Sequence, residues 1–185
     1  MQVRNWDSIR RVKKIFWPEE SLRPVNVWAL LDAGRDDRIC DLMSRSYLDK
    51  CCLFAGQLTP QLERVAPHLL QVSPRDSVTD SLIELGWGRA WGIFVQSDAS
   101  IGTLRRHFRT LLRVKDESGN FLLFRYYDPR VLRVYLPTCR AGELRAVFGP
   151  SVIKFWIEAE DPTSIMSFET AEDGALKKEL LRIWN

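Results

Sequence analysis

Residues 90–114, AWGIFVQSDASIGTLRRHFRTLLRV, combine the two patterns that decide the fold of this chain. The first eight residues are mostly apolar and end at the Ser97–Asp98 step, which is typical of a short strand. From Ser100 onward apolar residues recur at helical spacing, so residues 100–113 are predicted to form an amphipathic helix. Its apolar stripe consists of Leu104, Phe108, Leu111 and Leu112. The arginines lie away from this stripe and give the helix a basic outer face.

The same order of elements recurs in residues 121–138, FLLFRYYDPRVLRVYLPT. A strand is predicted over 121–127, followed by a helix that begins at Pro129 and is ended by Pro137. The Asp128 carboxylate can accept hydrogen bonds from free backbone N–H groups in the first turn, and Pro129 loses nothing there by lacking its own. The Asp-Pro step is therefore interpreted as the start of a helix.

The rest of the chain continues this alternation. Further strands are predicted at residues 27–31, 51–54, 66–72 and 151–159. Further helices are predicted at residues 7–17, 36–48, 76–86, 139–148 and 174–184. The sequence therefore predicts an α/β fold, with α+β as the alternative: a single compact layered domain with a mixed β-sheet flanked by helices, and amphipathic helices at both termini.

Three segments are distinguished by their polarity patterns. Residues 1–24 are expected to form a basic amphipathic helix and a linker, and residues 25–160 the α/β core domain. Residues 161–185 are expected to form an amphipathic helical tail.

Composition narrows the possible function classes. A net charge of +3 is too small to indicate nucleic-acid binding by itself. The longest apolar runs fall far short of the roughly 18–20 residues that span a bilayer, so no membrane insertion is expected. The N-terminus has no uninterrupted apolar core of the kind found in signal peptides, so a cytoplasmic location is expected.

The sequence offers no arrangement typical of an active site or a metal site. The four cysteines have no C-x-x-C spacing, and two histidines are too few for a His-rich metal centre. A triad could combine His107 with Asp98 or Asp128 and a serine or cysteine, but no G-x-S-x-G turn surrounds a nucleophile. The glycines form no phosphate-binding loop. We therefore expect no catalytic residue, no metal and no cofactor, and a protein that is not an enzyme.

Arginines and aromatic residues alternate through residues 104–135. Such a mixture could stack bases and pair with phosphates, as a nucleic-acid-binding module does. Alternatively, the aromatic rings belong to the core, and the arginines pair with Asp32, Asp98 and Asp128 or solvate the outer face. Because the net charge is near neutral, the second interpretation is favoured and nucleic acid is not the expected partner.

Four residues are candidates for contact with a partner protein. Trp17 and Trp184 lie near the ends of the chain on segments of mixed polarity, and Arg109 and Arg113 lie on the basic helix face. Tryptophan and arginine are enriched at protein–protein hot spots. The alternative for the tryptophans is that they attach the terminal helices to the sheet.

The order of several motifs resembles a known family. They are VWALLDAGR at 27–35, LFAGQL at 53–58, SDA at 97–99, LRRH at 104–107 and FRYYDPRVLR at 124–133. This succession is similar to the type VI secretion effector adaptor or chaperone family (Tap/TEC type), catalogued as domain of unknown function 4123. The resemblance covers roughly residues 25–155.

The resemblance implies a non-enzymatic cytoplasmic adaptor of a Gram-negative bacterium. Such a protein holds a toxic effector and helps to load it onto the VgrG spike or its PAAR-type tip. The expected partners are therefore an effector protein and a spike protein. The residues expected to maintain the scaffold as family motif residues are Asp32, Asp98, Arg105, Arg106, Arg125, Asp128, Pro129 and Arg130.

Overall fold

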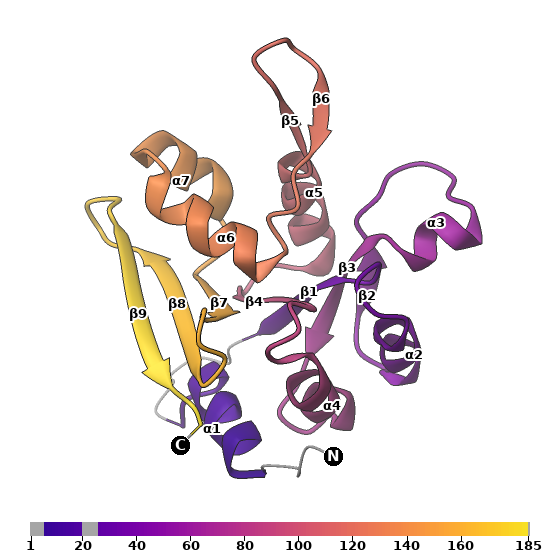
Figure 1. Cartoon of the computed structure of the whole chain (residues 1–185), viewed down its shortest axis with the longest axis vertical. Helices are drawn as coiled ribbons and strands as arrows, with labels where there is room; N and C mark the ends of the chain where they lie inside the picture. Colours follow the sequence, from indigo (N-terminus) through magenta and orange to yellow (C-terminus); the bar gives the residue numbers. More distant parts are fainter. Residues whose placement is uncertain (1–5, 20–25, 185) are drawn as a thin grey trace.

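The computed structural model describes residues 6–19 and 26–184 and places a single large sheet at the centre of the molecule (Figure 1). Within these residues the sheet has seven strands in the order β2-β3-β1-β4-β7-β8-β9. They are β1 (Val27–Asp32), β2 (Lys50–Cys52), β3 (Pro67–Val72), β4 (Gly92–Gln96), β7 (Lys154–Glu158), β8 (Ser164–Thr170) and β9 (Leu176–Arg182). Strands β5 (Arg113–Lys115) and β6 (Phe121–Leu123) form a separate hairpin.

Helices cover both faces of the sheet (Figure 1). They are α1 (Trp6–Phe16), α2 (Arg38–Arg45), α3 (Pro60–Arg64), α4 (Ser77–Gly86), α5 (Ile101–Leu111), α6 (Pro129–Tyr135), the 3-10 helix η1 (Leu136–Thr138) and α7 (Ala141–Phe148). Helices α5, α6 and α7 pack on one face, and α1, α2 and α4 pack on the other.

Strand β1 shows why the core has two parts. All six of its residues are buried, and their side chains alternate between the two faces. Trp28 and Leu30 pack beneath α5 and α6, whereas Val27, Ala29 and Leu31 pack against α1 and α4. A central strand covered by helices on both faces needs an uninterrupted apolar run, which residues 27–31 provide. The predicted compact, layered α/β fold is confirmed.

The prediction of a mixed sheet is wrong, because every pair of adjacent strands in the described residues is antiparallel. Strands β3 and β4, which α4 connects, do run parallel to each other, but β1 lies between them and runs in the opposite direction. Alternation of strands and helices predicts parallel crossovers only when the crossing strands become neighbours. The sequence pattern carries no information about a third strand inserted between them.

The predicted C-terminal helix is also wrong. Residues 176–182 form β9, which pairs with β8 from Ser164↔Arg182 to Thr170↔Leu176. No strand is predicted over residues 164–170, so the apolar residues after 175 lack a predicted partner strand and their spacing favours a helix. Cross-strand pairing overrides the local helical spacing here.

The other predicted elements are present with bounds that differ by a few residues, whereas α3, β5 and η1 have no predicted counterpart. Helix α1 buries Ile9, Val12 and Phe16 against the sheet, as its amphipathic pattern indicates. The strand predicted over 121–127 ends at Leu123. Residues 1–5 and the linker at 20–24 in the predicted division lie outside the described residues, and that division into three segments stays a prediction.

Candidate partner-binding groove

The first turn of α6 holds a cluster of charged side chains. Asp128 is almost fully buried, and its Oδ1 accepts a hydrogen bond from the backbone N–H of Arg130 at 2.9 Å. Its Oδ2 accepts hydrogen bonds from Arg130 Nη2 at 2.6 Å and from Arg35 Nη2 at 3.0 Å. Arg125 forms an ion pair with the buried Asp32 at the end of β1. The structure thus brings Asp32, Arg125, Asp128 and Arg130 together.

Two opposing effects set the pKa of Asp128. Burial raises this pKa, but the hydrogen bonds from Arg130 and the charges of Arg130 and Arg35 outweigh burial, so the pKa lies below its ordinary value. The carboxylate is therefore charged at neutral pH, as a helix cap and ion-pair partner must be.

The other family motif residues are not part of this cluster. Asp98 is exposed between β4 and α5 and has no hydrogen bond or ion pair to another residue in the described parts of the chain. Arg105 Nε donates to the carbonyl of Cys52 at 3.2 Å, and Arg106 Nη2 donates to Thr103 Oγ1 at 3.3 Å. Pro129 is the buried first residue of α6.

Helix α5 positions the segment that follows β2. Arg109 Nε donates to the carbonyl of Leu53 at 2.9 Å, and its Nη2 donates to the carbonyl of Phe54. These two hydrogen bonds fix the backbone of residues 53–54. Because both acceptors are neutral carbonyl groups, they do not compensate the positive charge of the guanidinium group.

An apolar groove lies between this segment, the end of α5 and the β5–β6 hairpin. It encloses about 380 Å³. Its lining residues are Leu53, Phe54, Ala55, Leu58, Leu62, Arg109, Leu112, Arg113 and Leu123. Apart from two arginines on the α5 side, the lining is apolar, which is typical of a surface that binds a partner's apolar side chains.

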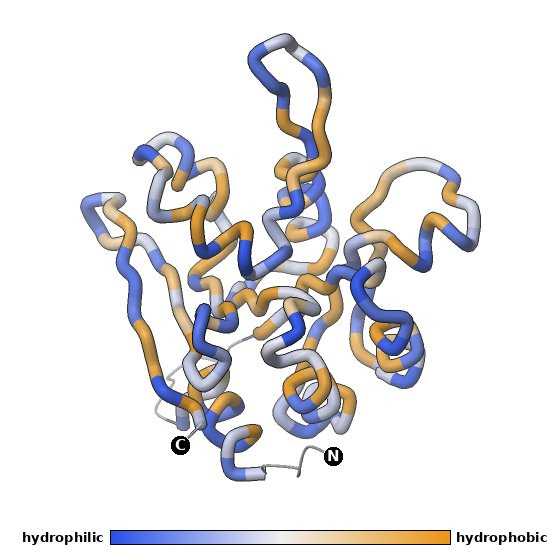
Figure 2. Tube along the Cα trace, viewed as in Figure 1, coloured by the Kyte–Doolittle hydropathy of each residue, from blue (hydrophilic) through white to orange (hydrophobic). Residues whose placement is uncertain are grey.

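The β5–β6 hairpin projects from the end of α5, away from the main sheet (Figure 1). Its β6 limb is apolar along its length (Figure 2), and Phe121, Leu122 and Leu123 are 58%, 51% and 50% exposed. The Arg113 guanidinium group lies 4.1 Å from the centre of the Phe121 ring. Three consecutive large apolar residues at half exposure on an isolated two-stranded hairpin gain stability when a partner covers them.

The structure separates the four predicted contact residues into two pairs. Arg109 and Arg113 line the groove. Trp17 and Trp184 are half-buried and pack with the core on the opposite face of the sheet, where the Trp184 ring lies 5.8 Å from that of Trp87. This packing helps to attach the terminal elements to the sheet, and contact of either tryptophan with a partner stays a prediction.

The aromatic residues of the arginine-rich stretch belong mainly to the core. Tyr126 and Tyr127 are buried, and Phe124 and Tyr135 pack against the same core cluster. Burial raises the pKa of Tyr127 to about 12. The buried rings of Tyr126 and Tyr127 are not available to stack bases, and among the aromatic residues of this stretch only Phe121 is mostly exposed, so their placement does not favour the nucleic-acid alternative.

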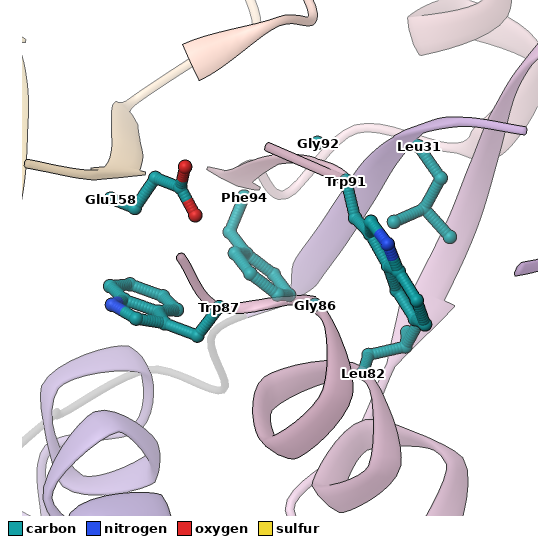
Figure 3. Close-up of a pocket in the computed structure, with 8 residues that line it drawn as sticks. All are labelled: Leu31, Leu82, Gly86, Trp87, Trp91, Gly92, Phe94 and Glu158. Carbon is teal, nitrogen blue, oxygen red and sulfur yellow. The ribbon is translucent and has the colours of Figure 1, made fainter. Parts of the chain in front are cut away.

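A second cavity, beside β4, is too small for a ligand. It encloses about 20 Å³, room for about one water molecule. Figure 3 shows the Glu158 carboxylate near Trp87 and Phe94 at its rim. This carboxylate accepts hydrogen bonds from the N–H groups of Gly88 at 2.6 Å and Ala90 at 3.1 Å, while burial raises its pKa. Glu158 thus holds the turn before β4.

Both histidines are hydrogen-bonded to backbone carbonyls. His107 Nε2 lies 2.8 Å from the Val147 oxygen, and His68 Nδ1 lies 2.9 Å from the Ala66 oxygen. Burial lowers the pKa of His68. Within residues 6–19 and 26–184, no group of three or more His, Cys, Asp and Glu side chains is arranged to hold a metal ion.

Sequence reasoning identified the arginines of the groove but missed its apolar walls. Residues 121–123 are predicted only as part of a strand over 121–127 with no assigned partner strand, and residues 58–62 are assigned to no element. One local signal was available: FLL follows RVKDESGN, whose turn residues Asp116 and Gly119 connect it directly to RVK. That spacing is typical of an independent hairpin.

No helix in the parts of the chain that the structure describes is long and apolar enough to cross a membrane.

No curated protein and no solved structure matched the chain in the comparisons. A family model described as "Domain of unknown function (DUF4123)" matches residues 27–146, a range that includes both the groove and the charged cluster at α6. The chain belongs to this family.

Proposed function

We propose that this protein is a non-enzymatic adaptor that binds a type VI secretion effector in the cytoplasm and promotes its loading onto the VgrG or PAAR-type spike. The observation that carries the proposal is the arginine-rimmed apolar groove beside an exposed apolar hairpin. Membership of the DUF4123 family and the resemblance of its motifs to effector adaptors support the type of partner.

The groove has the properties expected of a surface that binds a protein segment. Its walls come from residues 53–62, from the end of α5 and from the β5–β6 hairpin. Arg109 on α5 holds the first of these walls in place through its hydrogen bond to the Leu53 carbonyl. Covering the exposed half of a leucine or phenylalanine side chain contributes roughly 1 kcal/mol. Several such side chains lie close together here, so a partner segment can gain the affinity of a specific complex without a large interface.

Leu123→Asp is expected to weaken effector binding at least tenfold, because it places a carboxylate at the apolar wall of the groove. The measurement is titration of the purified protein against type VI effectors of the same organism, with size exclusion to establish a defined complex. Loading is measured as co-elution of the effector with a VgrG or PAAR-type spike protein.

Leu180→Asp is the matched control, because Leu180 is similarly exposed, at 58% against 50% for Leu123, but lies on the edge strand β9. It is expected to leave effector binding unchanged. Equal binding by both variants would contradict the groove as the binding site, and the lack of any complex with effector or spike would contradict the adaptor function.

A further inference from the structure

The hairpin beside the groove has an unpaired backbone edge. Phe124 N–H donates to the Leu112 carbonyl at 2.9 Å, and Asp116 N–H donates to the Asn120 carbonyl at 3.0 Å. In an antiparallel pair the bonded positions alternate, so these bonds direct the N–H and C=O groups of Phe121 and Leu123 away from β5. Since β6 pairs only with β5 in the described residues, this edge is open to a third strand.

The open edge of β6 adjoins the groove. Leu123 lies on β6 and lines the groove, opposite the segment from Leu53 to Leu62. In the hairpin register Leu123 is opposite Arg113, and Phe121 is opposite Lys115, so all four side chains share one face. A strand added along β6 would direct every second side chain toward this face.

The rim of the groove is positively charged. Among the described residues, no carboxylate forms an ion pair with Arg109, Arg113 or Lys115. Arg113 and Lys115 instead lie over the Phe121 ring, at 4.1 Å and 5.1 Å from its centre. A segment bearing carboxylates would supply the missing counter-charges, whereas a basic segment would be repelled.

We infer that the groove binds an extended segment of the partner, which adds as a third strand along β6, places alternate apolar side chains in the groove and carries acidic residues that face Arg113 and Lys115. This inference rests on the proposed function and specifies the chemistry of the segment that is bound. Backbone hydrogen bonds from Phe121 and Leu123 supply affinity, and the groove supplies side-chain selectivity.

The test is a phage-display selection of random dodecapeptides on the full-length protein, with the Leu123→Asp variant used to remove peptides that bind elsewhere. The expected consensus has apolar residues at i and i+2 and a net negative charge. Arg113→Gln with Lys115→Gln is expected to weaken the selected peptide about fivefold at low salt, whereas Arg145→Gln on α7 is expected to have no effect.

Backbone methylation tests the strand geometry directly. Methylating the peptide amides that face β6 is expected to weaken binding at least tenfold, whereas methylating the alternate amides is expected to be tolerated, because only one edge of the added strand pairs with β6. Equal effects at both sets of positions would overturn the inference.

Other outcomes would also overturn it. Apolar residues spaced at i, i+3 and i+4 would indicate a bound helix, and failure to enrich any groove-dependent peptide would exclude a linear segment. In both cases, loss of whole-effector binding by Leu123→Asp would still support the proposed function.

Two other occupants of the groove would also overturn the inference. A dimer in light scattering that Leu123→Asp dissociates would assign the groove to a second copy of the chain. Salt-sensitive binding of poly(dT) that requires Arg113 would assign the groove to a polyanion.

Discussion

Replacing Gly92 with alanine is expected to prevent the sheet from forming. Gly92 is the first residue of β4 and is paired with Leu31 of β1. A Cβ atom at this position would lie 2.1 Å from the Leu30 carbonyl oxygen, 2.9 Å from the Leu30 carbonyl carbon and 3.0 Å from the Leu31 Cα atom. All three atoms belong to the backbone of the most buried strand, so relief requires β1 and β4 to separate.

The expected loss exceeds about 4 kcal/mol in the free energy of unfolding, which places this substitution among the most destabilising single changes. The measurement is soluble yield, followed by urea denaturation of any soluble fraction. Gly142→Ala is the matched control, because a Cβ atom there meets only Arg145 Nη2 at 3.8 Å. This control is expected to leave stability unchanged or slightly higher. A Gly92→Ala protein with the wild-type urea midpoint would show that the backbones of β1 and β4 leave room for a Cβ atom at position 92, which would contradict the close approach of Gly92 to Leu30.

Replacing Asp128 with alanine is expected to lower the free energy of unfolding by about 3 kcal/mol. Loss of the helix cap accounts for about 1 kcal/mol of this. The rest comes from Arg35, which is only partly exposed and loses its carboxylate partner, so its charge is left uncompensated. Arg130 is more than half exposed and contributes little.

Two further variants make the Asp128 prediction specific. Asp128→Asn keeps an oxygen that can accept from the Arg130 N–H and is expected to lose about half as much stability. Asp98→Ala removes another motif aspartate, which is exposed, and is expected to leave the urea midpoint unchanged. If Asp98→Ala and Asp128→Ala had equal effects, the charged cluster at α6 would not be a source of stability.

The contribution of Asp128 should also depend on pH. Its pKa is lowered in the folded protein from the ordinary value of 3.8, so folding favours the charged form. The stability that it provides is therefore complete above the unfolded pKa and is lost as the pH falls through the folded pKa. The difference in melting temperature between wild type and Asp128→Ala should be large at pH 7 and should shrink as the pH falls below the ordinary pKa of 3.8. A constant difference across this range would contradict a lowered pKa.

Local signals in the sequence were sufficient for elements whose structure depends on nearby residues. The Asp128–Pro129 step predicted the start of α6, because a cap and a first-turn proline act within one helical turn. The stripe from Leu104 to Leu112 predicted α5, because one side of that helix is buried on the core. The run at 27–31 predicted the buried strand β1, because a strand covered on both faces needs consecutive apolar residues.

The candidate site was only partly predictable. Arg109 and Arg113 were identified from the basic face of the predicted helix 100–113, although the structure ends α5 at Leu111 and places Arg113 in β5. The apolar walls were not, since Leu58 and Leu62 are about sixty residues from Leu123 in sequence and approach it only when Arg109 ties the segment after β2 to α5.

The sequence alone determined the start of α6, the buried strand β1, the apolar stripe of α5 and where arginines gather, because these depend on propensity, periodicity and caps over a few residues. Only the tertiary structure decided that β1 lies between β3 and β4, that residues 176–182 pair with β8 as a strand, and that a hairpin stands apart from the sheet beside a groove. Each of these depends on backbone hydrogen bonds or packing between distant segments, and the choice of partner is a property of the whole chain.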